Sequence, residues 1–181
     1  WNDSVNCPDT AFIQIHAKEP LEVDLSENQT ICKGQSTELN VDEGYTYRWW
    51  SDYQSGIPAL SGIEVQPNRT ALYFVEVNDG QGCQQLDSVW VEVNNPIKLL
   101  NFQQDTSLLP NEELWVTAEI ENYEDLNWQA FNVDLNCYDC LNPLLTYPNS
   151  DEVMLSINAL PGCPNVDTSF SIVSDQTFTV F

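Results

Sequence analysis

Hydrophobic and polar residues alternate with a period of two over much of the chain, which is the pattern of half-buried β-strands. Val89, Val91 and Val93 would face one side of such a strand, while Trp90 and Glu92 would face the other. The same pattern predicts further strands at 37–41, 45–50, 63–65, 71–77, 114–121, 126–131 and 153–157. Turn sequences rich in Asn, Asp, Gly and Pro separate them, and no segment shows a helical period. The pattern predicts an all-β protein.

An Asp-Ser or Asp-Thr pair recurs between a cysteine and a strand. The pairs begin at Asp9, Asp87 and Asp167, so they are 78 and 80 residues apart, and a three-residue joint follows each strand. Modules of this length made of short strands are typical of immunoglobulin-like β-sandwiches. We therefore expect four parts: the last strand of a preceding module with its joint at 1–20, complete modules at 21–95 and 96–176, and the first strand of a following module at 177–181.

The chain is strongly acidic along its whole length. Its 181 residues include 28 acidic and 5 basic side chains, giving a formal charge of −23, of which −2 lies in residues 1–20, −9 in 21–95 and −12 in 96–181. So few cations argue against partners such as nucleic acid or an anionic membrane surface. No apolar run is long enough to insert into a membrane. Six cysteines in this composition indicate an oxidising compartment, so we expect a secreted or cell-surface location.

Two sets of motifs resemble a known type of repeat. One set, in module 21–95, comprises TICKGQS at 30–36, GYTYRW at 44–49, TALYFVEVND at 70–79 and the pair Gly82-Cys83. The other, in module 96–176, comprises NCYDCLNP at 136–143 and Gly162-Cys163. These resemble tandem immunoglobulin-like or PKD-like repeats of large proteins secreted by gliding bacteria. The resemblance implies export by the type IX route and roles in adhesins, filaments or stalks beside secreted enzymes.

The cysteines of the repeat positions do not match completely between the modules. Cys32 precedes the second strand of module 21–95 and Cys83 precedes its last strand, so we expect these two to form a disulfide. The position of Cys32 corresponds to about Leu109 in the next module, which leaves Cys163 without the matching partner. We expect Cys163 to be free or paired outside the chain, and the partner of Cys7 to precede residue 1.

Cys137 and Cys140 form a C-x-x-C pair that allows three interpretations. A zinc site needs a second pair of ligands, and the chain offers only Cys7, Cys163 and the distant His16. A thioredoxin-like redox site needs a helix N-terminus in a βαβ unit, which the pattern lacks. We therefore favour a small disulfide that closes a loop between two strands.

Neither catalysis nor a cofactor is indicated. His16 is the only histidine and has no Ser or Cys nucleophile near it in sequence. Carboxylate pairs are too frequent among 28 acids to identify a glycosidase. The acidic loops at 42–43, 121–125 and 151–152 could bind Ca²⁺ weakly, but they lack the ligand spacing of a calcium loop, and a solvated acidic surface is the simpler explanation. We expect no enzyme, no metal site and no cofactor beyond weakly bound Ca²⁺.

Four aromatic side chains are expected to point outward: Phe12, Trp50, Trp90 and Trp115. Trp50 follows Trp49 in one strand, so one of the two must face away from the core. Outward aromatics can stack on sugar rings, or pack against a neighbouring module or chain, which is the more common outcome.

Ser4, Thr10 and Ser88 match an Asp-(Ser/Thr)-aliphatic pattern that the resembled bacteria use for O-glycosylation. A hydrogen bond from the aspartate in an ordinary turn would favour the same residues.

These features together predict a structural or adhesive segment of a long secreted surface protein. Such a filament, appendage or adhesin would mediate attachment or gliding-type contact. Its partners would be neighbouring modules of the same chain, with laterally packed copies and surface glycans as further candidates. The alternative is a glycan-binding or spacer segment attached to a secreted hydrolase.

Overall fold

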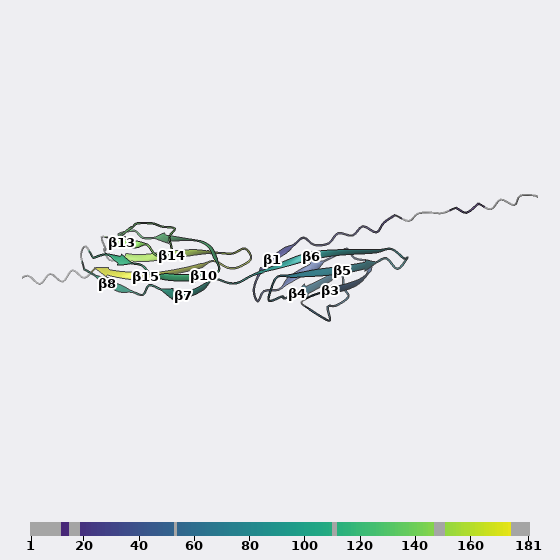
Figure 1. Ribbon diagram of the computed structural model, residues 1–181, viewed down its shortest axis with the longest axis horizontal. Helices are drawn as coiled ribbons and strands as arrows, with labels where there is room; N and C mark the ends of the chain where they lie inside the picture. Colours follow the sequence, from purple (N-terminus) through teal and green to yellow (C-terminus); the bar gives the residue numbers. More distant parts are fainter. Residues whose placement is uncertain (1–11, 15–18, 53, 110–111, 147–150, 175–181) are drawn as a thin grey trace, which may run out of the picture.

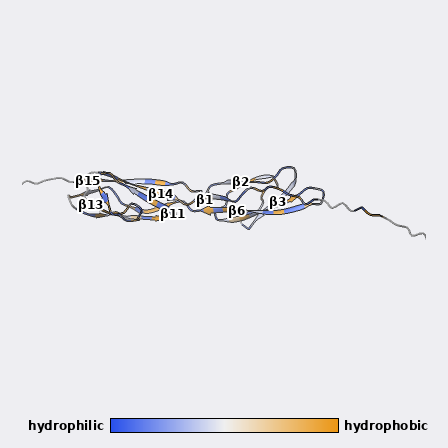
Figure 2. Ribbon diagram, turned by 90° about the horizontal axis from the view of Figure 1, so that it is seen from above, coloured by the Kyte–Doolittle hydropathy of each residue, from blue (hydrophilic) through white to orange (hydrophobic). Residues whose placement is uncertain are grey.

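The computed structural model describes residues 12–14, 19–52, 54–109, 112–146 and 151–174, and all structural statements below refer to these residues. Every regular element among them is a β-strand, as the sequence pattern predicts. They contain no helix that is long and apolar enough to cross a membrane. The strands form two modules that follow one another along the long axis (Figures 1 and 2). The first module comprises strands β1 to β6 and the second comprises strands β7 to β15.

The first module is a sandwich of two sheets. The larger sheet has the order β1 (Gln29–Cys32), β6 (Gln84–Asn94), β5 (Ala71–Asn78) and β3 (Thr46–Ser51). β1 runs parallel to β6, and the other neighbours are antiparallel. The smaller sheet pairs β2 (Thr37–Asn40) with β4 (Gly62–Val65), and Leu25 adds a bridge to Val41.

The second module repeats this arrangement. Its larger sheet has the order β8 (Thr106–Leu108), β15 (Val166–Ser174), β14 (Asp151–Ala159) and β11 (Tyr123–Gln129), again with a parallel first pair. The opposing strands are β7 (Lys98–Phe102) with β10 (Ala118–Glu121), and β12 (Asp134–Leu135) with β13 (Leu144–Thr146) and β9 (Leu114–Trp115). The 80-residue repeat seen in the sequence is therefore a repeat of structure.

Each module has its own hydrophobic core. Alternate residues of β5 (Ala71, Tyr73, Val75 and Val77) are buried, as expected from the period of two. One core comprises buried residues from Val23 to Val91, and the other comprises buried residues from Leu108 to Ile172. Each core is organised around one tryptophan whose indole N–H donates to a loop carbonyl. Trp49 donates to Leu60 O (2.9 Å) in the first module, and Trp128 donates to Cys140 O (2.8 Å) in the second.

The single strand predicted at 114–121 is wrong in one respect, because the chain changes sheets in the middle of it. β9 pairs with β13, whereas β10 pairs with β7. Between them, the Val116 N–H donates to Pro143 O (2.9 Å) and the Ala118 N–H donates to the Asn142 side-chain oxygen (2.9 Å). These contacts with the 142–143 segment replace the regular ladder at the point where the strand leaves one partner for the other.

Candidate functional site: the joint between the modules

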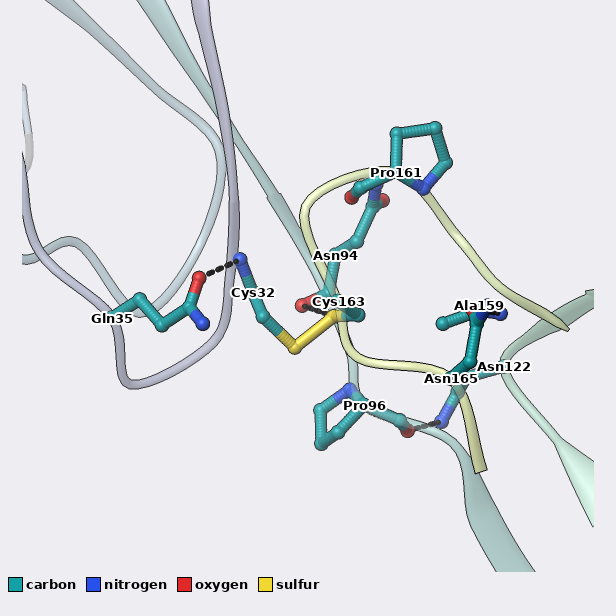
Figure 3. Close-up of a disulfide and its surroundings, with 9 residues drawn as sticks. All are labelled: Cys32, Gln35, Asn94, Pro96, Asn122, Ala159, Pro161, Cys163 and Asn165. Atoms are coloured by element: carbon teal, nitrogen blue, oxygen red, sulfur yellow. Dashed lines mark hydrogen bonds between the residues drawn. A yellow bond between two sulfur atoms is a disulfide. The ribbon is translucent and has the colours of Figure 1, made fainter. Parts of the chain in front are cut away.

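A short connection joins the two modules. β6 ends at Asn94 and β7 begins at Lys98. The Asn94 amide donates to Pro161 O (2.9 Å) in the β14–β15 hairpin, and the Asn122 amide of the β10–β11 turn donates to Pro96 O (3.1 Å). Side-chain amides therefore hold the connection to the second module from both sides, as Figure 3 shows.

A disulfide between Cys32 and Cys163 crosses this joint (Figure 3), with a Cα–Cα distance of 4.6 Å. Cys32 is the last residue of β1, and Cys163 lies in the β14–β15 hairpin of the other module. Because β1 runs parallel to β6 with Cys32 opposite Asn94, Cys32 lies at the end of the first module where the chain leaves it. The parallel register thus brings the cysteine to the joint.

The disulfide predicted between Cys32 and Cys83 is wrong, and the geometry of β6 explains why. Cys83 precedes the first residue of β6, whereas Cys32 lies opposite the last one. A strand of 11 residues is about 35 Å long, far beyond the roughly 7 Å between Cα atoms that a disulfide can bridge. Cys83 has no disulfide partner among the residues described.

The loop around Cys32 is fixed by its own hydrogen bonds. The Cys32 N–H donates to the Gln35 side-chain oxygen (3.2 Å), and the Gln35 N–H donates back to Cys32 O (2.9 Å). The Lys33 N–H donates to Asn94 O (2.8 Å), which attaches this loop to the end of β6. Cys32 itself is buried. The backbone that carries the Cys32 sulfur is therefore fixed by residues of the first module.

Gly162 allows the hairpin of the second module to approach β1 closely. Its φ of 82° is in the left-handed region that favours glycine. A Cβ atom at this position would lie 2.8 Å from Thr30 O and 3.0 Å from backbone atoms of Ile31. The neighbouring Cys163 therefore reaches Cys32 only because residue 162 has no side chain.

The structure also contains the local disulfide between Cys137 and Cys140 that the sequence predicts. This bond closes the loop that receives two hydrogen bonds from Trp128. The Trp128 backbone N–H donates to Tyr138 O (2.7 Å), and its indole N–H donates to Cys140 O (2.8 Å). The loop thus satisfies the polar atoms of a buried tryptophan.

Several acids of the predicted calcium loops have structural partners. The Phe131 and Asn132 N–H groups both donate to Asp151 Oδ2 (2.8 Å each), and the Glu152 N–H donates to Oδ1 (2.9 Å). Desolvation raises the pKa of Asp151, but these backbone hydrogen bonds together lower it by more. The pKa of Asp151 is therefore below its usual value. Within the described ranges there is no group of three or more His, Cys, Asp or Glu side chains placed to hold a metal ion.

The predicted outward aromatics have different surroundings. Phe12, Trp90 and Trp115 are exposed. Trp50 is partly covered, because its ring stacks on Phe74 with centroids 5.6 Å apart and the Arg48 guanidinium lies 5.5 Å from its centroid on β3.

Other predicted residues fall partly outside the described chain. Ser4, Cys7, Thr10 and His16 lie in the segments that the structure does not describe. Ser88 is exposed on β6, and its N–H donates to Asp87 Oδ1 (2.7 Å), which is the local hydrogen bond expected of an Asp-Ser pair. Glycosylation at Ser88 stays a prediction.

The Cys32–Cys163 bond is the feature that sequence reasoning missed, although the sequence carried a signal for it. The second module has Leu108 and Leu109 where the first has Cys32, whereas Cys163 is kept. If the bond lay within a module, the leucines at this place would leave Cys163 without a partner. A bond between modules explains the presence of Cys163, because its partner is Cys32 of the module before it.

Comparisons with known proteins agree with this architecture. Residues 20–96 match the family model described as "Ig-like domain CHU_C associated". A comparison with curated protein sequences found no match. Extracellular domains 3–5 of Drosophila OTK have a TM-score of 0.64 at 8% identity, covering 86% of this chain and 62% of that one. Immunoglobulin domains 1–4 of Sidekick-1 have a TM-score of 0.58 at 12% identity, covering 85% and 49%. Domains IG1 and IG2 of DIP-gamma have a TM-score of 0.51 at 11% identity, covering 85% and 98%.

These matches define the class of the protein. The chain consists of tandem immunoglobulin-like β-sandwiches, and its first module is similar to the CHU_C-associated Ig-like domains. Identities of 8–12% with the solved structures show a shared fold and nothing further about function.

Proposed function

We propose that this chain is a disulfide-linked segment of a long extracellular array of immunoglobulin-like modules, whose role is to carry load between a cell surface and what the array contacts. The observation that carries this proposal is the Cys32–Cys163 bond, which joins two modules that each have a separate core. A bond at this place fixes the position of one sandwich relative to the other, which no disulfide within a single module would do.

The inter-module disulfide changes the route by which force passes through the chain. When the ends of the chain are pulled, tension runs from Leu21 to Cys32, across the two sulfur atoms, and from Cys163 to Ser174. The two cysteines are 131 residues apart in sequence, so most of both modules lies in a closed loop outside this route. An extended loop of that size corresponds to about 450 Å of chain that force cannot release while the bond is intact.

Exposed apolar residues before the first module support a longer array. Phe12 and Ile13 are 93% and 86% exposed, and in the repeat they correspond to Trp90 and to the fully buried Val91. In a complete preceding sandwich Ile13 would be buried, as Val91 of β6 is buried in the core of the first module. We propose accordingly that 1–20 ends a preceding module, that 21–95 and 96–176 are complete modules, and that 177–181 begins another.

The acidic composition and the family match of the first module support a surface adhesin or filament of the type made by gliding bacteria and exported by the type IX route. The complete reading frame tests this context. Further modules on both sides with a C-terminal sorting domain would support it, whereas an adjoining catalytic domain would favour the role of a spacer in a secreted hydrolase.

Single-molecule force spectroscopy tests the mechanical role directly. The oxidised chain, pulled from its ends, should extend without long unfolding steps, and reduction should add about 450 Å of contour length. A variant with both Cys32→Ser and Cys163→Ser should behave like the reduced protein, while Cys83→Ser should behave like the unmodified oxidised chain. Release of the full contour from the oxidised chain would overturn the proposal.

A glycan-binding role is the second candidate, and one observation favours it. Trp90, which is 48% exposed, borders a shallow hollow with Asn28, Thr70 and Glu92, a combination of ring face and polar groups suited to a sugar. Trp115 lies in the other module, so the two tryptophans form no continuous row. Binding on a glycan array that is lost in Trp90→Ala but kept in Trp115→Ala would support this role, and no binding would dismiss it.

A further inference from the structure

We propose that the first module is itself linked to a preceding module through Cys83, which would form a disulfide with a cysteine at the position equivalent to Cys32. This inference rests on the proposed tandem array and names the partner of one surface within it. The partner is a module of the same kind located earlier in the same chain.

The strongest support is the state of the equivalent cysteine in the second module. Gly82-Cys83 lies between β5 and β6, and Gly162-Cys163 lies between the equivalent strands β14 and β15, 80 residues later. Both glycines have left-handed φ angles, 97° and 82°. Cys163 is bonded to the module that precedes its own. The same molecule therefore shows what a cysteine at this position does when its neighbouring module is present.

The surface around Cys83 also matches the surface that forms the joint. Gly44, with a φ of 97°, gives the β2–β3 turn the left-handed backbone that Asn122, with a φ of 61°, gives the β10–β11 turn, although Gly44 has no amide for the contact that Asn122 makes with Pro96 O. A Cβ on Gly162 would meet β1 of the preceding module, whereas a Cβ on Gly82 would have no atom within 4 Å. The position of Gly82 thus has open space where the position of Gly162 meets a neighbouring module.

The hairpin that carries Cys83 is held in shape by its own hydrogen bonds. Asp79 Oδ1 accepts from the Gln81 N–H (2.7 Å) and from the Cys83 N–H (3.0 Å), and the Asp79 N–H donates to Cys83 O (3.2 Å). The backbone of Cys83 is therefore fixed although its thiol is unpaired within the described residues. Formation of the disulfide would therefore cost little conformational freedom of this hairpin.

Formation of the bond requires an oxidant. The Cys83 thiol and the thiol of the preceding module together lose two protons and two electrons to form one S–S bond. A disulfide of an exported oxidoreductase, or a small-molecule disulfide, accepts them by thiol–disulfide exchange and is reduced to two thiols.

Disulfide mapping of two chains tests the inference. One is the 181-residue chain, and the other is the same chain extended upstream through its natural sequence to include the whole preceding module, both produced in an oxidising compartment. Each is alkylated without reduction and cut at its acidic residues, because 28 acids against 5 bases make that cleavage more informative than trypsin. Cys83 should be alkylated in the shorter chain. In the longer one it should be found in a peptide linked to the preceding module, and Cys83→Ser should leave that module's cysteine alkylated.

The outcomes separate this inference from the proposed function. If the upstream sequence encodes no module, the array itself is wrong, and the inference fails with it. If the module and its cysteine are present but Cys83 is alkylated, or is linked to Cys7, to a second copy or to a small thiol, the array stands and only this inference is overturned. An upstream module without a cysteine at the equivalent position overturns it as well.

Discussion

Replacing Cys32 and Cys163 together by serine should destabilise both modules, each by about 4 kcal/mol. When the second module unfolds beside a folded first module, the bond closes a loop from Asn94 to Cys163, which are 69 residues apart. When the first module unfolds instead, the loop runs from Cys32 to its register partner Asn94 and contains roughly 60 residues. The chain-entropy relation gives almost the same value for both loops, because it depends on the logarithm of loop length.

Urea denaturation measures this loss in each module. Trp49 and Trp128 are buried in different cores, so Trp49→Phe and Trp128→Phe backgrounds give fluorescence signals weighted towards one module at a time. A loss of about 4 kcal/mol is a large share of the 5–15 kcal/mol that stabilises a typical domain. Cys83→Ser is the matched control, because it removes a thiol without opening a loop.

The expected loss of stability is the same in both modules, and an asymmetric loss would contradict it. If the double serine variant lowers the stability of only one module, the bond acts as a local contact and does not restrict the unfolded chain on both sides. A loss below about 1 kcal/mol in both modules would show that the loops are already restricted without the bond.

Three further predictions concern single features of the second module. Gly162→Ala should strain the hairpin by about 1–2 kcal/mol and place a Cβ against Thr30 O, so the fraction of oxidised inter-module disulfide after refolding should fall, whereas Gly82→Ala, with open space, should leave it unchanged. Replacing Cys137 and Cys140 by alanine should cost about 1–2 kcal/mol in the second module alone, measured as a lower urea midpoint with earlier exposure of its tryptophan. Asp151→Asn should lower stability near neutral pH, and the difference from the natural protein should shrink as pH falls through the lowered pKa of Asp151, because the charge that the backbone N–H groups stabilise is then lost. A difference that persists in acid would mean that the hydrogen-bond geometry and not the charge is responsible.

The strands and the repeat could be predicted from the sequence because they depend on local pattern. Alternation along 71–77 gives the buried face of β5 directly, and the recurring Asp-(Ser/Thr) pair marks β6 and β15. The pairing of Cys32 could not be predicted in this way, because it depends on which strand lies beside β1 and in which direction. A parallel neighbour puts Cys32 at one end of β6, while Cys83 is at the other end.

The change of sheets between β9 and β10 could not be predicted from the sequence for a similar reason. Leu114 to Glu121 alternates without interruption, so the pattern contains no sign of a break. The break comes from Pro143 O and Asn142, which receive the N–H groups of Val116 and Ala118 from about 25 residues away in sequence. Local periodicity carries information on which side chains are buried, but not on which strand receives the backbone hydrogen bonds.

The surfaces that the two modules would offer to further neighbours differ in chemistry, because Cys83 lies on the first and Leu109 on the second. Leu109 follows β8, whose last residue, Leu108, lies opposite Ser174 as Cys32 lies opposite Asn94, and Leu109 is 58% exposed. A following module would therefore meet an aliphatic side chain there, and no disulfide could form across that joint. In an array of such modules, the two residues that face each other across a joint would decide whether the neighbours are locked or can pivot. The order of cysteine and leucine at this position along the whole chain would then determine the lengths of its rigid sections and the points at which it bends.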